Sequence, residues 1–407
     1  MGRLNTLDDW LNYQENLHFQ DINLGLERVK KVYQRLFPKG VSFKVISVAG
    51  TNGKGSTVAF IGSIYQQSNF KVAQFSSPHI LKYNERFVIN SVQATDEQIC
   101  HAFEKIESFR GETSLTYFEF STLAALIIFE LEKVDIAVLE VGLGGRLDSV
   151  NMVDNDVSVI TNIDIDHVDY LGNTRELIGL EKAGIMRKNT PCICADTNPP
   201  ASISQYAHQI KAQLEFVREK YASDIGLIGK HQQQNAATAM LAVQKLNKIL
   251  PVNTIQIKAG IKYAQLDARF QIKTINNKTV ILDVAHNAAA VKVLSAELAK
   301  QQCSTIAIFS ALKDKNISLM INEISMIINQ WLLVPLDVNR AINMKALSNE
   351  FNLNHNIHVC NDMQNAINRA LNDKQYQRVV IFGSFHVVAD ALKILIPFMK
   401  NNEEEIL

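Results

Sequence analysis

A glycine-rich loop carries the clearest chemical signal in this sequence. Gly50-Thr-Asn-Gly-Lys-Gly-Ser56 follows an apolar stretch typical of a buried strand and precedes a segment with helical apolar spacing. Such a loop turns its backbone N–H groups inward, beside the positive end of the following helix, and forms an anion site. Lys54 would add a mobile charge for the outer phosphates of a nucleotide, and Ser56 or Thr57 would offer a hydroxyl near a magnesium ion.

The loop departs from the strict G-x-x-x-x-G-K-[ST] pattern at two positions. Val48 stands where that pattern has its first glycine, and Gly55 follows the lysine where Ser or Thr is expected. The alternative interpretation is a glycine-rich turn with a surface lysine. The position of the loop between a strand and a helix favours phosphate binding over that alternative.

A second glycine-rich loop, Gly142-Leu-Gly-Gly145, follows a strand that ends near Glu140. It lacks the third glycine of a dinucleotide-binding fingerprint, because Leu147 occupies that position. Both loops follow strands, so we expect both at the carboxyl edge of one sheet, where α/β sheets bind ligands. Glu140 is then either a metal ligand or a carboxylate neutralised by Arg146, and the residues alone leave both interpretations open.

Acidic side chains and one imidazole follow the next expected strand. They are Asp164, Asp166, His167 and Asp169. Carboxylates suit magnesium, whereas imidazole is a softer and less usual ligand for it. On the residues alone, a solvated acidic turn is the favoured interpretation.

Three further segments place polar side chains at or near expected element ends. Ser76–His79 supplies hydroxyls after another strand, and Asp283 and His286 follow a strand in the second half of the chain. A second domain that presents Arg269 and Asp283 toward a phosphate loop would close over a nucleotide. Lys182 lies in or at the start of a helix, where a lysine is ordinarily on the surface.

Strands that alternate with helices, without strict polar alternation, predict mostly parallel sheets covered on both faces. We place a domain boundary between Ala259 and Arg269, which gives domains 1–265 and 266–407. We expect residues 196–229 to form structure at the edge of the sheet that continues into a linker. The expected strands are 44–49, 135–141, 157–161, 191–195, 278–284, 304–309, 331–334, 356–359 and 378–382, and the expected helices are 56–67, 118–132 and 231–248.

Composition excludes several classes of protein. The 41 Lys and Arg residues balance 41 Asp and Glu residues, which argues against a dedicated nucleic-acid or membrane-surface binder. The longest apolar run, Leu123–Phe129, is far shorter than the roughly 20 residues of a membrane span. Five cysteines without a C-x-x-C pair, and no apolar segment at the N-terminus, favour free thiols in a reducing cytoplasm.

From about Leu11 to about Asp390 the chain resembles the dihydrofolate synthase/folylpolyglutamate synthase family of Mur-ligase-like amide ligases. The motifs are highly specific in this order and spacing. They are Glu15–His18, Leu24–Arg28, Val48–Ser56, Ser76–His79, Tyr83–Arg86, Thr116–Phe120, Glu140–Asp148, Asp166–His167, Glu181–Ile185, Asn235–Thr238, Arg269–Gln271, Asp283–Asn287 and Gly383–His386. One departure is Leu266-Asp-Ala-Arg-Phe270, where the family has Leu-Pro-Gly-Arg-Phe.

The resemblance implies roles for individual residues. Lys54, Lys182 and His286 are the catalytic candidates, with Lys182 carbamylated and His286 a candidate base. The implied magnesium ligands are Ser77, Glu140 and His167. The implied ATP-binding residues are Thr51, Asn52, Gly53, Lys54, Gly55, Ser56, Asn235, Arg269 and Asp283. The implied pterin-substrate residues are Asp21, Ile22, Asn23, Leu24, Thr116, Tyr117, Phe118, Glu119, Leu147, Asp148 and Ser149.

The resemblance also implies the fold and the reaction. It predicts a P-loop-type, mostly parallel N-terminal ATPase domain and a smaller Rossmann-like α/β C-terminal domain. The expected reaction joins L-glutamate to dihydropteroate and then to reduced folates, with ATP and Mg²⁺; a second magnesium ion and K⁺ are left open. We expect a monomer without nucleic-acid or membrane partners. The alternatives are a folylpolyglutamate synthase without the dihydropteroate reaction, a cell-wall amide ligase and a non-enzymatic nucleotide-binding module.

Overall fold

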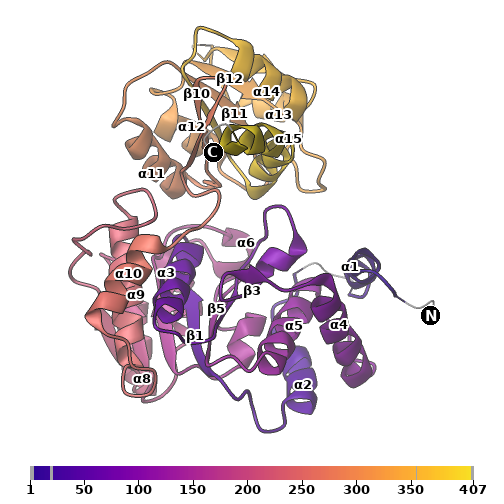
Figure 1. The fold of residues 1–407 in the computed structure, drawn as a ribbon, viewed down its shortest axis with the longest axis vertical. Helices are drawn as coiled ribbons and strands as arrows, with labels where there is room; N and C mark the ends of the chain where they lie inside the picture. The colour runs from indigo at the N-terminus through magenta and orange to yellow at the C-terminus, as the bar shows by residue number, and fades with distance from the viewer. Residues whose placement is uncertain (1–3, 19–21, 354, 405–407) are drawn as a thin grey trace. The chain divides into compact units, whose positions relative to one another are not determined.

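The computed structural model describes residues 4–18, 22–353 and 355–404, and the chain divides into two compact units, Met1–Gln265 and Leu266–Leu407 (Figure 1). Each unit is an α/β layer structure with a mostly parallel sheet. The predicted fold class, α/β with two mostly parallel sheets, is therefore confirmed. Within the described residues no helix is long and apolar enough to cross a membrane.

The sheet of the first unit has the strand order β4-β3-β2-β5-β1-β6-β7-β8. Strands β2, β5, β1, β6, β7 and β8 run parallel, and β3 and β4 form an antiparallel hairpin at one edge. The strands are β1 (Lys44–Ala49), β2 (Val72–Phe75), β3 (Phe87–Ile89), β4 (Val92–Gln93), β5 (Ile136–Glu140), β6 (Val157–Ile160), β7 (Pro191–Cys194) and β8 (Gln213–Phe216).

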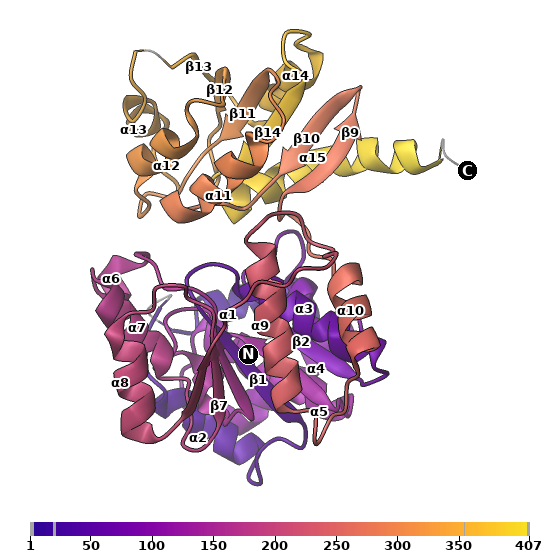
Figure 2. The same ribbon diagram turned by 90° about the vertical axis from the view of Figure 1, so that its left-hand side faces the viewer.

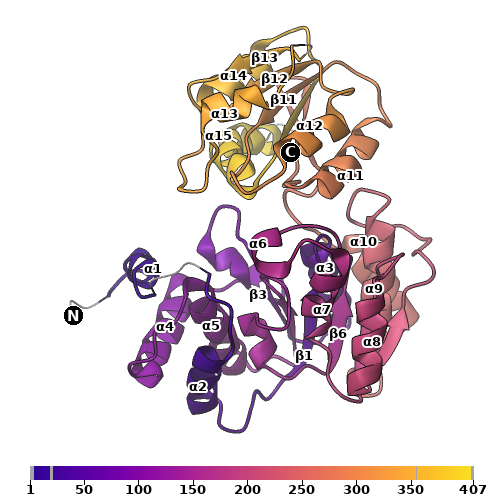
Figure 3. The same ribbon diagram turned by 180° about the vertical axis from the view of Figure 1, so that it is seen from behind.

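Helices cover both faces of this sheet (Figure 2 and Figure 3). Helices α3, α9 and α10 pack on one face, and α1, α2, α4, α5, α7 and α8 contribute to the core on the other. The helices are α1 (Leu7–Glu15), α2 (Glu27–Leu36), α3 (Lys54–Gln67), α4 (Asp96–Arg110), α5 (Tyr117–Leu131), α6 (Val168–Leu171), α7 (Arg175–Ala183), α8 (Ala201–Ile210), α9 (Gln232–Lys245) and α10 (Thr254–Tyr263), with the 3₁₀ turns η1 (Tyr83–Arg86) and η2 (Ser149–Met152).

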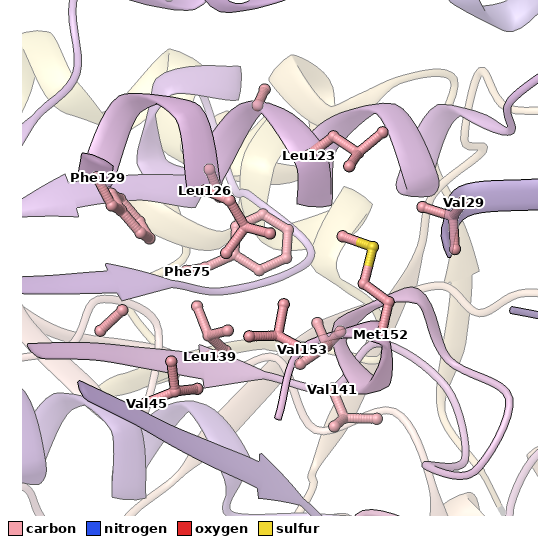
Figure 4. Close-up of a cluster of buried hydrophobic side chains, with 14 of the residues drawn as sticks. Val29, Val45, Phe75, Leu123, Leu126, Phe129, Leu139, Val141, Met152 and Val153 are labelled. Carbon is pink, nitrogen blue, oxygen red and sulfur yellow. The ribbon is translucent and has the colours of Figure 1, made fainter. Parts of the chain in front are cut away.

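The apolar side chains of α5 anchor the second face of the sheet. Leu123, Leu126 and Phe129 point from this helix toward strand residues such as Phe75 and Leu139 (Figure 4). All five are fully buried. Deleting one such side chain typically costs about 2–5 kcal/mol of stability, so this core fixes α5 and the polar residues at its N-terminus.

The second unit has the strand order β13-β12-β11-β14-β10-β9, with β9 antiparallel at the edge. Trp331 is fully buried on one face and packs against the rings of Phe309, Phe351 and Phe382. The elements are β9 (Gln271–Ile275), β10 (Lys278–Leu282), α11 (Ala288–Leu298), β11 (Thr305–Phe309), α12 (Ile317–Ile324), β12 (Gln330–Leu333), α13 (Met344–Asn349), β13 (Ile357–Val359), α14 (Met363–Asn372), β14 (Arg378–Phe382) and α15 (Phe385–Glu404).

The expectation of sheet-edge structure within residues 196–229 is confirmed by the edge strand β8, whereas the helix α8 was not predicted. This stretch contains the helix α8 and the edge strand β8. Pro200 does not break structure here, because it is the N-cap of α8, and the first positions of a helix tolerate proline. Strand β8 is partly exposed and four residues long, so it carries little apolar patterning.

Candidate active site

The carboxyl ends of four neighbouring strands meet at one edge of the first sheet. In the parallel register Val48 of β1 lies opposite Glu140 of β5, and Ala49 lies opposite Ile160 of β6. Phe75 of β2 lies opposite Leu139 of β5. The two glycine-rich loops, Ser77 and the acidic segment after β6 therefore begin at neighbouring positions of the same edge.

The first glycine loop ends in the N-terminus of α3. Gly53 is the N-cap, with a left-handed φ of +86°, and no described side chain caps this end of the helix. The first backbone N–H groups of α3 are thus available to an anion. The Nζ of Lys54 donates to the carbonyls of Gly50 at 3.2 Å and Thr51 at 3.3 Å. The ammonium consequently lies over the loop where phosphates would bind.

The segment after β6 holds the loop in place. Thr51 N donates to Asn162 O at 2.8 Å, and Asn52 N donates to Asn162 Oδ1 at 2.6 Å. Thr51 Oγ1 donates to Asp164 O at 3.1 Å, and Thr161 Oγ1 donates to Asn52 O at 2.7 Å. These bonds join residues more than 100 positions apart and bring the acidic segment beside the glycine loop.

Helix α9 adds polar side chains to the same loop. A Cβ on Gly53 would lie 2.8 Å from Asn235 Oδ1, so the Asn235 amide is in contact with the N-cap of α3. Asn235 Nδ2 donates to Gln232 Oε1 at 2.9 Å, and Gln232 Nε2 donates to Ser56 Oγ at 3.2 Å. The structure thereby brings together the predicted nucleotide residues 51–56 and Asn235. Gln232 is a residue that the sequence did not predict, although it is three positions before Asn235 on one helix face.

Lys182 is buried, so the expectation of a surface lysine is wrong. It lies in the last turn of α7, which packs on the second glycine loop. A Cβ on Gly145 would lie 3.0 Å from Lys182 Cα and 2.6 Å from the carbonyl of Glu181. Burial, reinforced by the positive charge of Lys54, lowers the pKa of Lys182 to about 7, although Asp166 and Asp148 oppose the shift. A large fraction of this amine is therefore neutral near physiological pH.

Arg146 pairs with Glu181 at the second glycine loop. Its guanidinium forms an ion pair with Glu181 at 2.7 Å, and its backbone N–H donates to the carbonyl of the same residue. Glu140 itself is buried at the end of β5. The metal-ligand interpretation of Glu140 stays a prediction.

The predicted metal ligands Ser77, Glu140 and His167 lie at or after the ends of three neighbouring strands. Ser77 follows β2, Glu140 is the last residue of β5, and His167 follows β6, with a left-handed φ of +52° at the N-cap of α6. Among the described residues, no three His, Cys, Asp or Glu side chains gather as a metal site, so this set depends on the Ser77 hydroxyl. The hydroxyl and the carboxylate suit a hard divalent cation, and the imidazole is the softer and less usual ligand of the predicted set.

The predicted pterin-substrate segments 22–24, 116–119 and 147–149 are joined by hydrogen bonds. Gly25 N donates to Leu147 O at 3.3 Å, and the hydroxyls of Ser149 and Thr122 share a hydrogen bond of 2.6 Å. A Cβ on Gly142 would lie 2.6 Å from the ring of Phe118, so the second glycine loop contacts the start of α5. Asp21 lies outside the described residues.

Asp148 is buried between the second glycine loop and η2. Its carboxylate accepts from Leu143 N at 2.8 Å and from Val150 N at 2.9 Å. Burial raises the pKa of Asp148 to about 6, although these backbone hydrogen bonds and the charge of Lys54 oppose the shift. The two carboxylate oxygens thus fix the loop through these hydrogen bonds. When ionised, the Asp148 carboxylate also places a negative charge near Lys182.

In the second unit, the predicted residues Arg269, Asp283 and His286 form their own cluster. Asp283 accepts from Phe270 N and Ala285 N, both at 2.8 Å, and burial raises its pKa against the opposing charge of Arg269. His286 Nδ1 donates to the carbonyl of Val284 at 2.9 Å, which makes Nε2 the acceptor nitrogen of the neutral ring.

The ring of Phe385 joins two members of this cluster. The Arg269 guanidinium lies 5.2 Å from its centroid, and the His286 ring lies 5.9 Å from it. Phe385 begins α15 directly after Gly383-Ser384, and Gly383 N donates to Ala285 O at 3.0 Å. The carboxyl ends of β10 and β14 therefore carry the cluster, which the strand-end motifs of the sequence had indicated.

The comparisons with known proteins agree with this arrangement. The family described as Mur ligase middle domain matches residues 48–198, and the Mur ligase glutamate ligase domain matches residues 268–385. The dihydrofolate synthase/folylpolyglutamate synthase of Escherichia coli is 36% identical over 96% of this chain and 95% of that protein. The Bacillus subtilis protein of the same name is 34% identical over 91% of this chain and 95% of that protein.

Solved structures match over nearly the whole chain. A structure of Escherichia coli FolC in complex with DHPP and ADP has a TM-score of 0.90 at 35% identity, covering 97% of this chain and 98% of that chain. The Yersinia pestis bifunctional folylpolyglutamate synthase/dihydrofolate synthase, complexed with AMPPNP and Mn ion, has a TM-score of 0.88 at 37% identity. It covers 96% of this chain and 98% of that chain.

Proposed function

The chain belongs to the dihydrofolate synthase/folylpolyglutamate synthase family of Mur ligases, and on that premise we propose its complete reaction. It is an ATP-dependent ligase that joins L-glutamate to 7,8-dihydropteroate and further glutamates to reduced folates, with release of ADP and phosphate. Residues 1–265 form the ATP-binding domain and residues 266–407 the ligase domain. The enzyme acts on small molecules as a monomer in the cytoplasm.

The first glycine loop is the proposed phosphate site. No described side chain caps the N-terminus of α3, the ammonium of Lys54 contacts the loop carbonyls of Gly50 and Thr51, and the Asn235 amide borders Gly53. Arg269 and Asp283 of the second unit are the proposed further ATP contacts. Ser77, Glu140 and His167 would hold the Mg²⁺, which, when bound, neutralises phosphate charge and orients the transferring group.

A carboxylate does not condense with an amine unaided, because its leaving group would be oxide. In the proposed reaction the substrate carboxylate attacks the γ-phosphorus, the bond to the ADP oxygen breaks, and an acyl phosphate forms. Lys54 and the loop N–H groups stabilise the charge on the transferring oxygens. The amino group of glutamate then attacks the acyl carbon, phosphate leaves, and His286 Nε2 is the candidate acceptor of the amine proton.

Lys182 is the proposed site of carbamylation. Only a neutral amine attacks carbon dioxide, and burial beside Lys54 favours the neutral form of Lys182. The resulting carbamate would add an anionic oxygen donor at the same edge as Glu140. Lys182 is buried in the last turn of α7, and this burial favours carbamylation over a purely structural role for the side chain.

One observation carries the proposed function. The lysine-bearing glycine loop lies at the carboxyl edge of the first sheet, the second glycine loop at the same edge contacts the start of α5, and the chain matches a family member over 96% of its length. The test is ADP release with Mg-ATP and glutamate, run in parallel with dihydropteroate and with a reduced folate. Activity with both substrates is the expected result.

The other outcomes of this assay separate the alternatives. Activity with the reduced folate alone would reduce the protein to a folylpolyglutamate synthase and remove the dihydropteroate step. ATP binding without ADP release on either substrate would indicate a nucleotide-binding module. Either result would overturn the corresponding part of the proposal.

A further inference from the structure

A chain of polar contacts connects two of the predicted substrate segments through Arg28. The NH2 of Arg28 donates to Asn23 O at 2.9 Å and to Glu119 Oε1 at 3.0 Å, and its NH1 donates to Asn23 Oδ1 at 3.2 Å. The Glu119 side chain is about 5% exposed and that of Arg28 about 27%, so the carboxylate of this ion pair is buried and the guanidinium is partly exposed. One guanidinium thus holds residues 22–24 against the N-terminus of α5.

The same contacts continue beyond Asn23. Asn23 Nδ2 donates to His18 Nε2 at 3.0 Å, and His18 Nδ1 donates to Ser114 Oγ at 3.0 Å. His18 is buried, and burial, with the nearby charge of Arg28, lowers its pKa. Asn23 is therefore held from both sides, by Arg28 and by His18, and each of these side chains also reaches residues 114–119.

The side chains at the start of α5 are already used by the fold. Thr116 Oγ1 accepts from Glu119 N at 3.2 Å, and Glu119 Oε2 accepts from Thr116 N at 2.8 Å, which is a reciprocal capping box. The second carboxylate oxygen of Glu119 accepts from Arg28. Both carboxylate oxygens of Glu119 are therefore engaged within the fold, one in the capping box and the other with Arg28.

We propose that Arg28 is a positioning residue for the pterin substrate, which holds residues 22–24 in the binding conformation before the substrate arrives. This inference rests on the proposed function, because the substrate is the one proposed above. A segment that is already ordered loses little conformational entropy when the ligand binds. It therefore binds the ligand more tightly than a mobile segment with the same contacts would. Loss of the contact should therefore weaken binding of the pterin substrate and leave the nucleotide site unchanged.

The test compares steady-state kinetics of the full-length wild-type enzyme and Arg28→Gln. Removing two or three hydrogen bonds from a charged group should raise KM for dihydropteroate by about 10-fold or more. The KM values for ATP and glutamate should stay within about twofold. The matched control is Arg35→Gln, because Arg35 lies on the same helix and donates to the carbonyls of Phe109 and Arg110 at the end of α4. Its KM values should equal those of the wild type.

Two further variants separate positioning from general destabilisation. Arg28→Lys keeps the charge near Glu119 but cannot bind Asn23 and Glu119 together, so its KM for dihydropteroate should fall between those of wild type and Arg28→Gln. Asn23→Ala removes the other end of the contact and should also raise this KM. If Arg28→Gln does not fold, these two variants decide the question.

The results distinguish failure of this inference from failure of the proposed function. A wild-type enzyme without ADP release on dihydropteroate would refute the proposed function, and this inference with it. An active wild type together with an unchanged dihydropteroate KM in the Arg28 and Asn23 variants would refute the inference alone. Equal increases in the KM values for ATP and for dihydropteroate would also refute it, since that pattern indicates loosening of the whole unit.

Discussion

The proposed carbamylation of Lys182 depends on the neutral form of a buried amine. With a pKa of about 7, about nine-tenths of the Lys182 side chains are neutral at pH 8. A lysine with the ordinary value of 10.5 would be neutral in only about 0.3% of molecules at that pH. Burial therefore raises the reactive population by a factor of roughly 300, and this factor is the reason to expect carbamate at ambient carbon dioxide.

The experiment removes carbon dioxide and then restores it. Enzyme prepared in argon-sparged buffer should lose most of its kcat, and added bicarbonate should restore it. Incubation with ¹³C-bicarbonate should give a carbamate signal in the wild type and none in Lys182→Met. Below about pH 7 the Lys182 amine is protonated, so a higher bicarbonate concentration should be needed to restore half of the lost kcat. Full activity without carbon dioxide, or no carbamate signal at pH 8, would contradict the argument.

The same pKa predicts how stability changes with pH. The folded-state pKa of Lys182 lies below its value of 10.5 in the unfolded chain, so between about pH 7 and pH 10.5 the unfolded state binds more protons. The penalty for burying the amine is present below pH 7 and disappears as the pH rises through this window. Lys182→Met should lack this slope in carbon dioxide-free unfolding measurements, whereas parallel pH profiles for both proteins would refute the assigned shift.

Three other changes test the site and the fold. Lys54→Ala should abolish turnover, because it removes the ammonium that contacts the loop carbonyls, and a near-normal kcat/KM would contradict the phosphate assignment. Gly53→Ala should raise the ATP Kd and lower stability by about 1–2 kcal/mol, since φ is +86° and the new Cβ would meet Asn235 Oδ1 at 2.8 Å; an unchanged Kd would be evidence against that contact. Trp331→Ala should lower the free energy of unfolding of the second unit by about 3–5 kcal/mol in urea denaturation, and a loss under about 1 kcal/mol would contradict the packing described.

Local patterns predicted the positions of the site loops well. The strand before each glycine loop is a short apolar run, and the start of α3 follows from the glycines and the polar residues at 51–56. Because a strand of a parallel sheet ends at a known edge, the sequence also predicted that these loops would meet. Most of the residue roles came from the family resemblance instead, since hydroxyls, carboxylates and glycines are common in any turn.

Contacts between distant residues explain what the sequence did not predict. Lys182 is buried because α7 packs on Gly145, and nothing near residue 182 in the sequence indicates that contact. Arg146 pairs with Glu181, a partner 35 positions away, so its role could not be assigned from its own motif. Arg28 lies within one of the family motifs, but the positioning role proposed for it follows from its contact with Glu119, 91 positions away.

The charge of Lys54 connects the phosphate site to Lys182. After burial, Lys54 is the second cause of the lowered pKa of Lys182, so removing its charge should raise that pKa. Lys54→Met should therefore need more ¹³C-bicarbonate for half-maximal carbamate at Lys182, a readout that requires no turnover. The control is Lys54→Arg, which keeps the charge and should leave the carbamate titration close to that of the wild type. An identical titration in wild type and Lys54→Met would show that burial alone sets the state of Lys182, and that the loop lysine serves only the nucleotide.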